Sequence, residues 1–312
     1  MAITRSDIPD LLVPGLKTEF ELAYRSELED SLADRIATVV NTTMPAQKYG
    51  WLGSCPPMRE FIDERRPSGM ASYAVTIEDK VFESTIAVDR KALEDDQLGL
   101  LRLRIRDLAG RVAQHRHQIT VGALAGGAAA TCYDGTAFFG SAHPVGGGTA
   151  FNLSSAALSN SSLAEAMATM MGYTDDQAVP LGIVPDTLVV GPSLMWDATE
   201  LVESPVVVFK PTSSAGRPAT NYVNALQGRL KLVVTPFLSG ADAGKWFLLD
   251  TKRAIKGVIL QQREDIPVEF TAVEATGGSE SAFMRDRYLY GVRARYNVGY
   301  GLWQAAYVGG AS

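Results

Sequence analysis

Three histidines are the side chains of this sequence best suited to acid–base or metal chemistry. His143 lies near Asp134 and Ser141 in a turn-rich stretch, and these are the residue types of a nucleophilic triad. Ser141 lacks the surrounding Gly-x-Ser-x-Gly motif that presents a nucleophilic serine on a sharp turn. His115 and His117 stand two apart in a predicted helix, so they face different directions and cannot share a metal ion. We expect His115 to be a core histidine and His143 to hold a structural turn.

The acidic cluster of Glu94, Asp95 and Asp96 could bind a metal ion. The same residues fall in the first turn of a predicted helix, where negative charge stabilises the positive end of the helix dipole. The glycines at 146–148 are not followed by a lysine, and no nucleotide-binding glycine motif occurs in the chain. We therefore predict no catalytic, cofactor-binding or metal-binding residues.

A second group of charged residues mixes both signs within a short segment. It comprises Arg59, Glu60, Asp63, Glu64, Arg65 and Arg66. One interpretation is a solvated loop surface. The other is a set of charge-assisted contacts to another subunit.

Composition limits the classes of function. The 312 residues carry a net charge of −6 and no basic tail. Because binding a nucleic-acid backbone requires clustered Lys and Arg, we expect only weak, non-specific contact with DNA. No run of 18 apolar residues and no secretory signal occur, so no membrane span is predicted. Cys55 and Cys132 favour reduced thiols in a cytosolic protein, with a disulfide between them as the alternative.

Several predicted elements position these residues. The first is an N-terminal segment, 1–47, with one predicted helix that ends before Pro45. Residues 71–90 alternate apolar and polar side chains, with a phase shift after Lys80. Residues 49–88 are therefore predicted to form a long two-stranded projection. An isolated hairpin is only marginally stable in water, so we expect it to lie on its own domain or on a neighbour.

A long helix is predicted from Lys91 to about Ala125. Apolar residues recur at spacings of three and four at Leu101, Ile105, Leu108, Val112, His115 and Ile119. The opposite face carries Arg102, Arg104, Arg106, Arg111, Gln114 and Arg116. At 1.5 Å per residue this helix spans ~50 Å, which suits a structural spine.

The second half of the chain predicts a compact α/β lobe at residues 150–255. It contains a helix at 161–172 capped by Ser161 or Ser162, strands at 184–191, 230–238 and 246–250, and a helix at 193–201. Alternate residues from Tyr288 to Leu302 are apolar, which predicts a long strand with one buried face. Residues 266–273 are its predicted antiparallel partner.

This order of elements resembles the Hong Kong 97-type capsid fold. Several short sequence motifs resemble those of the Mu-like prophage major head subunit family. They are Trp51 with Arg59-Glu60-Phe61 and Arg65, Lys80-Val81-Phe82-Glu83 with Val88 and Arg90, Asp95-Asp96, Tyr133-Asp134-Gly135 with Phe138-Phe139, His143-Pro144, Trp246, Asp250, Gln262-Arg263-Glu264 and Tyr290-Gly291-Val292-Arg293-Ala294-Arg295. The resemblance covers about residues 10–308.

The resemblance implies an α+β fold with named parts. They are an N-terminal arm at 1–47, an E-loop at 48–90, a P-domain at 91–139 and 256–302 with the spine helix at 91–125, an A-domain at 140–255 and a C-terminal tail at 303–312. It also implies contacts between subunits, for which we select Trp51, Arg59, Glu60, Arg65, Arg66, Glu83, Glu94, Asp95 and Asp96. Because the arm begins almost at Met1, we expect no built-in scaffolding segment.

The function implied by the resemblance is a major capsid protein, not an enzyme. Its copies would form pentamers and hexamers that close into an icosahedral shell around phage DNA, assembled in the bacterial cytoplasm and found in the virion. A separate scaffolding protein, a portal and a decoration protein are the expected partners, and no cofactor is expected. The alternatives are an encapsulin-like compartment and, in a different class, a hydrolase that uses His143.

Overall fold

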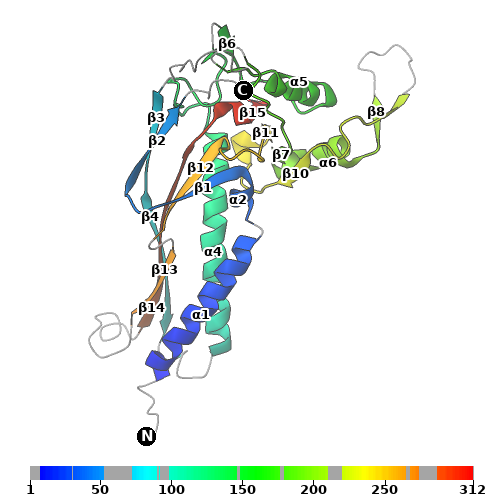
Figure 1. Ribbon diagram of the computed structural model, residues 1–312. Helices are drawn as coiled ribbons and strands as arrows, with labels where there is room; N and C mark the ends of the chain where they lie inside the picture. Colours follow the sequence, from blue (N-terminus) through cyan, green and yellow to red (C-terminus); the bar gives the residue numbers. More distant parts are fainter. Residues whose placement is uncertain are drawn as a thin grey trace, which may run out of the picture.

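The computed structural model describes residues 8–29, 31–52, 72–89, 91, 98–145, 148–175, 179–209, 220–264, 268–273 and 287–311. They form an elongated lower part, in which two long helices lie beside long strands, and an upper part of shorter elements (Figure 1). The mixture of helices and strands confirms the α+β class. Within the described residues, no helix has the length and apolar character needed to cross a membrane.

The long helix α4 (Leu98–Ala125) runs through the lower part beside α1 (Ile8–Glu29), as Figure 1 shows. Along its predicted apolar stripe Leu101, Ile105, Leu108 and Val112 are buried, whereas His115 and Ile119 are half-buried. Ile105 and Leu108 pack in one cluster with Phe20 of α1. The predicted start of the helix at Lys91 is helical, and residues 92–97 lie outside the described residues.

Arg116 departs from the polar face on which the helical pattern placed it, because it is only 3% exposed. Its guanidinium donates a hydrogen bond to Asp34 at 3.0 Å and another to Gln262 at 3.3 Å. The N-terminal segment covers this side of α4, so a residue that looks solvated in the sequence becomes the buried member of an ion pair with the partly exposed Asp34.

A five-stranded sheet packs against α4. Its strands are β1 (Ala37–Thr42), β12 (Val258–Arg263), β14 (Arg287–Tyr300), β13 (Val268–Val273) and β4 (Lys80–Asp89). The predicted antiparallel pairing of the last long strand with residues 266–273 is confirmed by β13 and β14. Along β14, Tyr290, Val292 and Ala294 are buried while the residues between them face outward.

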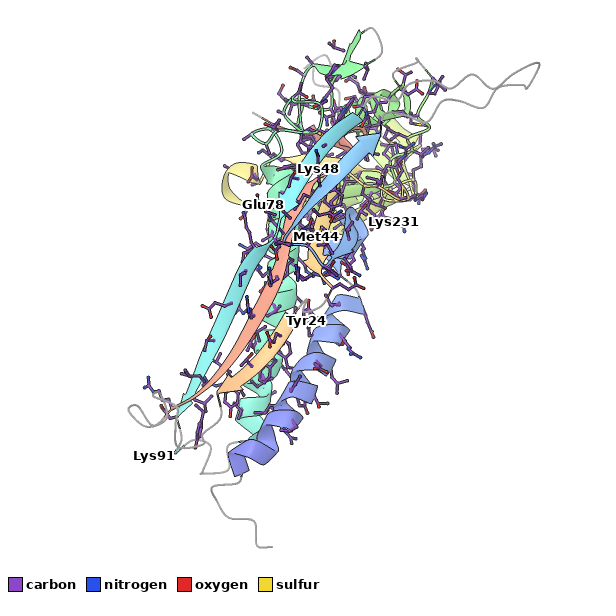
Figure 2. All side chains as sticks on the ribbon, turned by 60° about the vertical axis from the view of Figure 1, so that its left-hand side comes forward. Tyr24, Met44, Lys48, Glu78, Lys91 and Lys231 are labelled. Atoms are coloured by element: carbon purple, nitrogen blue, oxygen red, sulfur yellow. The ribbon has the colours of Figure 1, made fainter. Side chains whose placement is uncertain are left out.

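The predicted two-stranded projection of residues 49–88 is wrong in its second half. β2 (Ala46–Leu52) pairs antiparallel with β3 (Ser72–Glu78), whereas β4 leaves this hairpin and pairs with β14 along ten residues. Figure 2 shows β4 and β14 side by side along the lower part. The phase shift near Lys80 therefore marks a change of partner strand.

A single helix does not account for the segment 1–47 either. After α1 come α2 (Leu32–Ile36) and β1, which pairs parallel with β12. The ammonium group of Lys256 donates hydrogen bonds at 2.7–2.9 Å to the carbonyl oxygens of Asp34, Arg35 and Ala37, and so caps the end of α2. This part of the chain belongs to the core.

The upper part is built on a four-stranded sheet in the order β10-β7-β11-β15. Its elements are β5 (His143–Val145), β6 (Gly148–Ala150), α5 (Asn160–Met171), β7 (Thr187–Val190), η1 (Pro192–Leu194), α6 (Met195–Glu203), β8 (Val206–Phe209), β9 (Thr220–Val223), β10 (Lys231–Val234), η2 (Gly240–Asp242), β11 (Trp246–Leu249), η3 (Trp303–Ala305) and β15 (Ala306–Gly309). Helix α5 begins near its predicted place, but Ser159 caps it in a capping box with Ser162.

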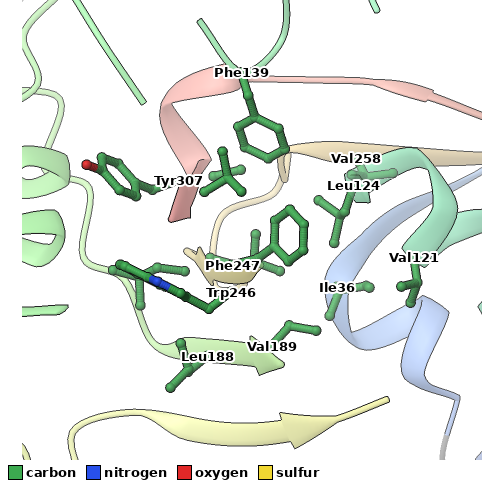
Figure 3. Packing of buried hydrophobic residues seen from close by; sticks show 14 of the residues in the cluster. Ile36, Val121, Leu124, Phe139, Leu188, Val189, Trp246, Phe247, Val258 and Tyr307 are labelled. Atoms are coloured by element: carbon green, nitrogen blue, oxygen red, sulfur yellow. The ribbon is translucent and has the colours of Figure 1, made fainter. Parts of the chain in front are cut away.

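One hydrophobic cluster joins the two parts. Phe247 of β11 and Val189 of β7 pack with Leu124 of α4 and Ile36 of α2 (Figure 3). The residues expected to form a C-terminal tail contribute β15, whose four residues are all buried beside β11. The end of the chain is therefore a core strand of the upper sheet.

Candidate functional site: a buried histidine cluster and a charged sheet face

His143 lies in β5 and is fully buried. Its Nδ1 atom lies 2.6 Å from Oδ2 of Asp134 and 2.9 Å from Oγ1 of Thr136. Oδ1 of Asp134 accepts hydrogen bonds from both the backbone N–H and the hydroxyl of Thr136. The turn between α4 and β5 thus brings the carboxylate to one side of the ring.

Asn152 holds the other side of the ring. Its Oδ1 atom lies 3.2 Å from Nε2 of His143 and accepts a hydrogen bond from the backbone N–H of Gly140 at 2.9 Å. Its Nδ2 group donates to the carbonyl oxygens of Phe138, Trp303 and Ala306, at 2.9, 3.2 and 3.2 Å. A single buried amide therefore joins the connector after α4 to the C-terminal segment.

The indole of Trp303 closes one face of the imidazole. The two rings are parallel within 10°, and their centroids lie 4.0 Å apart. Tyr173 meets the same indole edge-on, and its hydroxyl donates to the carbonyl oxygen of Phe151. We call Asp134, Thr136, His143, Asn152 and Trp303 the histidine cluster.

This geometry does not suit a catalytic base. A base needs a ring nitrogen with a free lone pair directed at a nucleophile, but both nitrogens of His143 face acceptor oxygens inside the protein. Among the described residues, the hydroxyl beside the ring belongs to Thr136, not Ser141, and it donates to Asp134. The structural role that the sequence predicts for His143 agrees with these contacts.

The sequence did not single out Asn152 or Trp303. The available signal was a lone amide between Phe151 and Leu153, because a polar side chain in an apolar run must find partners when buried. Nothing local identifies those partners, since Trp303 lies some 150 residues further along the chain.

The other two histidines belong to two different interfaces of α4. Nδ1 of His115 lies 2.8 Å from the hydroxyl of Tyr296, and its ring meets Phe82 edge-on. Nε2 of His117 lies 3.2 Å from the hydroxyl of Ser31. Burial lowers the pKa of both histidines. Within the described residues, no three His, Cys, Asp or Glu side chains are grouped for a metal ion.

Cys132, in the same connector, carries a buried thiol that is free of any disulfide. Burial, together with the nearby charge of Asp134, raises the pKa of this thiol to about 12. A thiol that keeps its proton at neutral pH is neither a nucleophile nor a metal ligand.

Of the residues selected for contacts between subunits, Glu83 is described. It is exposed on β4, and it accepts a hydrogen bond from the hydroxyl of Thr85. Strand β2 contains Trp51, but the side chain of this residue is outside the described set. The remaining selected residues, Arg59, Glu60, Arg65, Arg66, Glu94, Asp95 and Asp96, also lie outside the described residues.

Glu83 is part of a charged sheet face, which we define as Asp79, Glu83, Asp89, Glu269, Arg287, Arg293 and Arg295. Arg293 of β14 stands directly between Glu83 of β4 and Glu269 of β13 in the strand register. Arg287 donates to Asp89 at 2.8 Å, and Arg295 lies 2.6 Å from Asp79. Opposite charges across neighbouring strands stabilise the pairing by a few tenths of a kcal/mol to about 1 kcal/mol each.

A cavity of about 250 Å³ lies between α4 and the sheet. Phe82, His115 and Tyr296 give it an aromatic wall, and the exposed residues Glu83 and Arg111 also line it. A mostly apolar socket with the basic side chain of Arg111 in its lining would suit an apolar side chain of a partner.

The chain matches the family model described as Mu-like prophage major head subunit gpT over residues 10–160, 149–238 and 239–311. It is 26% identical over 303 residues to the Mu-like prophage FluMu major head subunit of Haemophilus influenzae, covering 95% of this chain and 73% of that protein. It is 24% identical over 302 residues to the major capsid protein of Escherichia phage Mu, covering 94% of this chain and 72% of that one.

Solved structures agree with these relatives. A chain of the procapsid of bacteriophage JBD30 is 28% identical, with a TM-score of 0.56, over 98% of this chain and 75% of that chain. A chain of Microbacterium phage Oxtober96 is 14% identical with a TM-score of 0.53, over 89% of this chain and 90% of that chain, and shares the fold.

Proposed function

The chain belongs to the Mu-like prophage major head subunit family and is a capsid protein of the virion shell, and from this premise we propose that its copies assemble as pentamers and hexamers that enclose phage DNA. The observation that carries the proposal is the family match, which runs from residue 10 to residue 311 and so includes both the long helix and the closing strand β15.

The parts named for the capsid fold are assigned here as part of the same proposal. The hairpin of β2 and β3 belongs to the proposed E-loop at 48–90. Helix α4 with β12, β13 and β14 belongs to the proposed P-domain at 91–139 and 256–302. The upper sheet and α6 belong to the proposed A-domain at 140–255, although β15 completes that sheet from the segment 303–312.

The charged sheet face is a proposed contact with a neighbouring copy, and so is the cavity on the opposite, α4-facing side of the sheet. The face carries both signs of charge and spans three strands. Glu83, Asp89, Glu269, Arg287 and Arg293 are exposed on it, whereas Asp79 is only 7% exposed beside Arg295. Charged contacts of this kind fix the relative alignment of two subunits and the specificity of their binding more than they increase its affinity. A closed shell needs many modest, repeated contacts of this type.

The proposed partners outside the chain are a scaffolding protein, a portal and a decoration protein. Packaged DNA would touch the shell only weakly, because the chain carries a net charge of −6.

We also propose that the chain has no enzymatic activity. The hydrolase alternative required an accessible His143, and this ring is buried with both nitrogens facing acceptors.

No observation on this chain favours the encapsulin-like alternative. Isolating the particles would separate the two kinds of shell, since packaged DNA supports a phage head and an enclosed enzyme supports a compartment.

Mass measurement on the purified full chain tests the assembly proposal. Species of about 170 and about 200 kDa, five and six times the 33.5 kDa chain, are expected alone or as dissociation products of shells.

Exchanging Glu83 for Arg tests the proposed contact, and Glu200→Arg, at an exposed position on α6, is the matched charge change. A loss of capsomers or shells specific to the Glu83 variant is expected, and equal behaviour of the two variants would contradict the contact.

A further inference from the structure

The orientation of the Asn152 amide is fixed by its own partners. Its Nδ2 group faces three carbonyl oxygens, and its Oδ1 atom faces the backbone N–H of Gly140. A flipped amide would direct its oxygen at the three carbonyls and its N–H groups at the Gly140 donor, so it would lose every one of these hydrogen bonds. The atom that faces Nε2 of His143 is therefore an acceptor oxygen, and Nε2 must carry a proton.

The other ring nitrogen also faces acceptors. The hydroxyl of Thr136 donates its proton to Oδ1 of Asp134, so a lone pair of Thr136 Oγ1 is left facing Nδ1 of His143 at 2.9 Å. The second atom beside Nδ1 is Oδ2 of Asp134 at 2.6 Å, a separation typical of a charge-assisted hydrogen bond. Nδ1 must therefore carry a proton as well.

From these contacts we infer that His143 is a doubly protonated imidazolium in the folded protein, and that its ion pair with Asp134 is a proton-dependent lock. The lock joins the connector at residues 131–140 to the C-terminal segment at Trp303–Ala306 through the shared partner Asn152.

The surroundings are suited to a buried cation. The face of Trp303 lies 4.0 Å from the ring, where an indole attracts a positive charge. Burial alone would raise the pKa of Asp134, but hydrogen bonds from His143 and Thr136 outweigh it and hold that pKa below its ordinary value, so Asp134 is a carboxylate. The nearby thiol of Cys132 is neutral, and Asp134 is the charged group that faces the ring among the described residues.

The lock is closed while the ring carries both protons. Loss of either proton at high pH would direct a nitrogen lone pair at the lone pair of an oxygen, and a buried repulsion of this kind destabilises the cluster. The contacts that would open are the backbone hydrogen bonds on either side of Asn152, from Asn152 N–H to Gly140 and from Val308 N–H to Asn152.

Nitrogen-15 NMR of the full chain labelled in its histidine rings tests the protonation state, in solution or, for shells, in the solid state. At pH 7.5 we expect two ring N–H groups on His143 and one each on His115 and His117, whose pKa values burial lowers. The latter two are internal controls in the same spectrum, assigned through His115→Gln and His117→Gln. A single N–H on His143 at pH 7.5 would overturn the inference.

Hydrogen exchange tests the lock. In Asp134→Asn we expect His143 to lose its second proton at pH 7.5 and the amides of Asn152 and Val308 to exchange at least tenfold faster, while the Ile105 amide in α4 is unchanged. Asp197→Asn, at an exposed carboxyl on α6, is the matched control. Unchanged exchange at Asn152 and Val308 would overturn the lock. If Asp134→Asn does not fold, the same exchange is followed in the unmodified chain, where the two amides must open together with loss of the second His143 proton as pH rises.

Discussion

The guanidinium of Arg116 and the carboxylate of Asp34 meet at 3.0 Å where α4 contacts α2, with Arg116 3% exposed and the Asp34 side chain 40% exposed. This pair joins the N-terminal segment to the long helix at the junction of the lower and upper parts. Gln262 of β12 accepts from the same guanidinium, so three elements meet at one side chain.

Arg116→Ala should therefore destabilise the fold by about 2–3 kcal/mol. That is less than the 3–5 kcal/mol typical of a fully buried pair, because Asp34 keeps contact with water. Arg111→Ala, which removes a 70% exposed arginine from the same helix, should change stability by no more than about 0.5 kcal/mol. Denaturant midpoints check both values, and equal effects of the two variants would contradict the buried role of Arg116.

Asp134 should make the fold sensitive to acid. Its pKa is depressed in the folded chain, because hydrogen bonds from His143 and Thr136 outweigh the effect of burial. Such a group stabilises the fold above its unfolded value near 3.8, and the contribution is lost as pH falls through the lower folded value. Asp134→Asn should be less stable than the natural chain at pH 6 and lose less further stability below pH ~4. Thermal midpoints from pH 2 to pH 7 test this, and parallel curves would refute it.

Gly309 of β15 should tolerate no side chain. A Cβ atom there would lie 2.1 Å from the indole of Trp246, which is fully buried in the upper core. Gly309→Ala should destabilise the fold by about 3 kcal/mol through overpacking. Gly244→Ala is the matched control, because no atom lies within 4 Å of a Cβ at that position. Comparable unfolding midpoints for the two variants would contradict the packing of β15 against β11.

The basic pair Arg65 and Arg66 should matter for assembly and not for folding. Reversing both to Glu is expected to leave the thermal midpoint unchanged and to abolish shells, because we predict that these residues contact another subunit. Reversing the exposed residues Lys17 and Arg25 of α1 gives the same change in net charge as a control. Circular dichroism measures the thermal midpoint, and light scattering measures shell assembly. Normal particles from the Arg65/Arg66 variant would show that these residues are not part of the proposed interface.

The elements that could be predicted were those in which the periodic pattern of apolar residues continues over a segment too long to arise by chance. Helix α4 repeats its apolar stripe over several turns, and β14 alternates over 14 residues. What could not be predicted was the choice of partner. The pattern around Lys80 showed a break, but only the folded chain shows that β4 pairs with β14 instead of returning along the hairpin. Likewise β1 is too short to signal its parallel pairing with β12.

Polar residues were the second source of error, for a different physical reason. Helical phase alone placed Arg116 in solvent, yet α2 covers that side of α4. Asn152 has no local feature beyond its apolar neighbours, and its role depends on Trp303 and Ala306 at the far end of the chain. The contribution of a buried polar group to stability depends on its hydrogen-bond partners, and tertiary structure determines which residues these are. The candidate contacts around Arg59 and Glu94 lie outside the described residues, so they stay predictions.

Electron microscopy of the purified full chain in negative stain, over a range of protein and salt concentrations, tests the central claim most directly. We predict closed shells, tubes or capsomers with five-fold or six-fold symmetry, since the chain is a capsid protein whose contacts repeat by symmetry. A particle field that contains only monomers under every condition, and also after co-expression with a scaffolding protein from the same gene cluster, would contradict self-assembly into a shell.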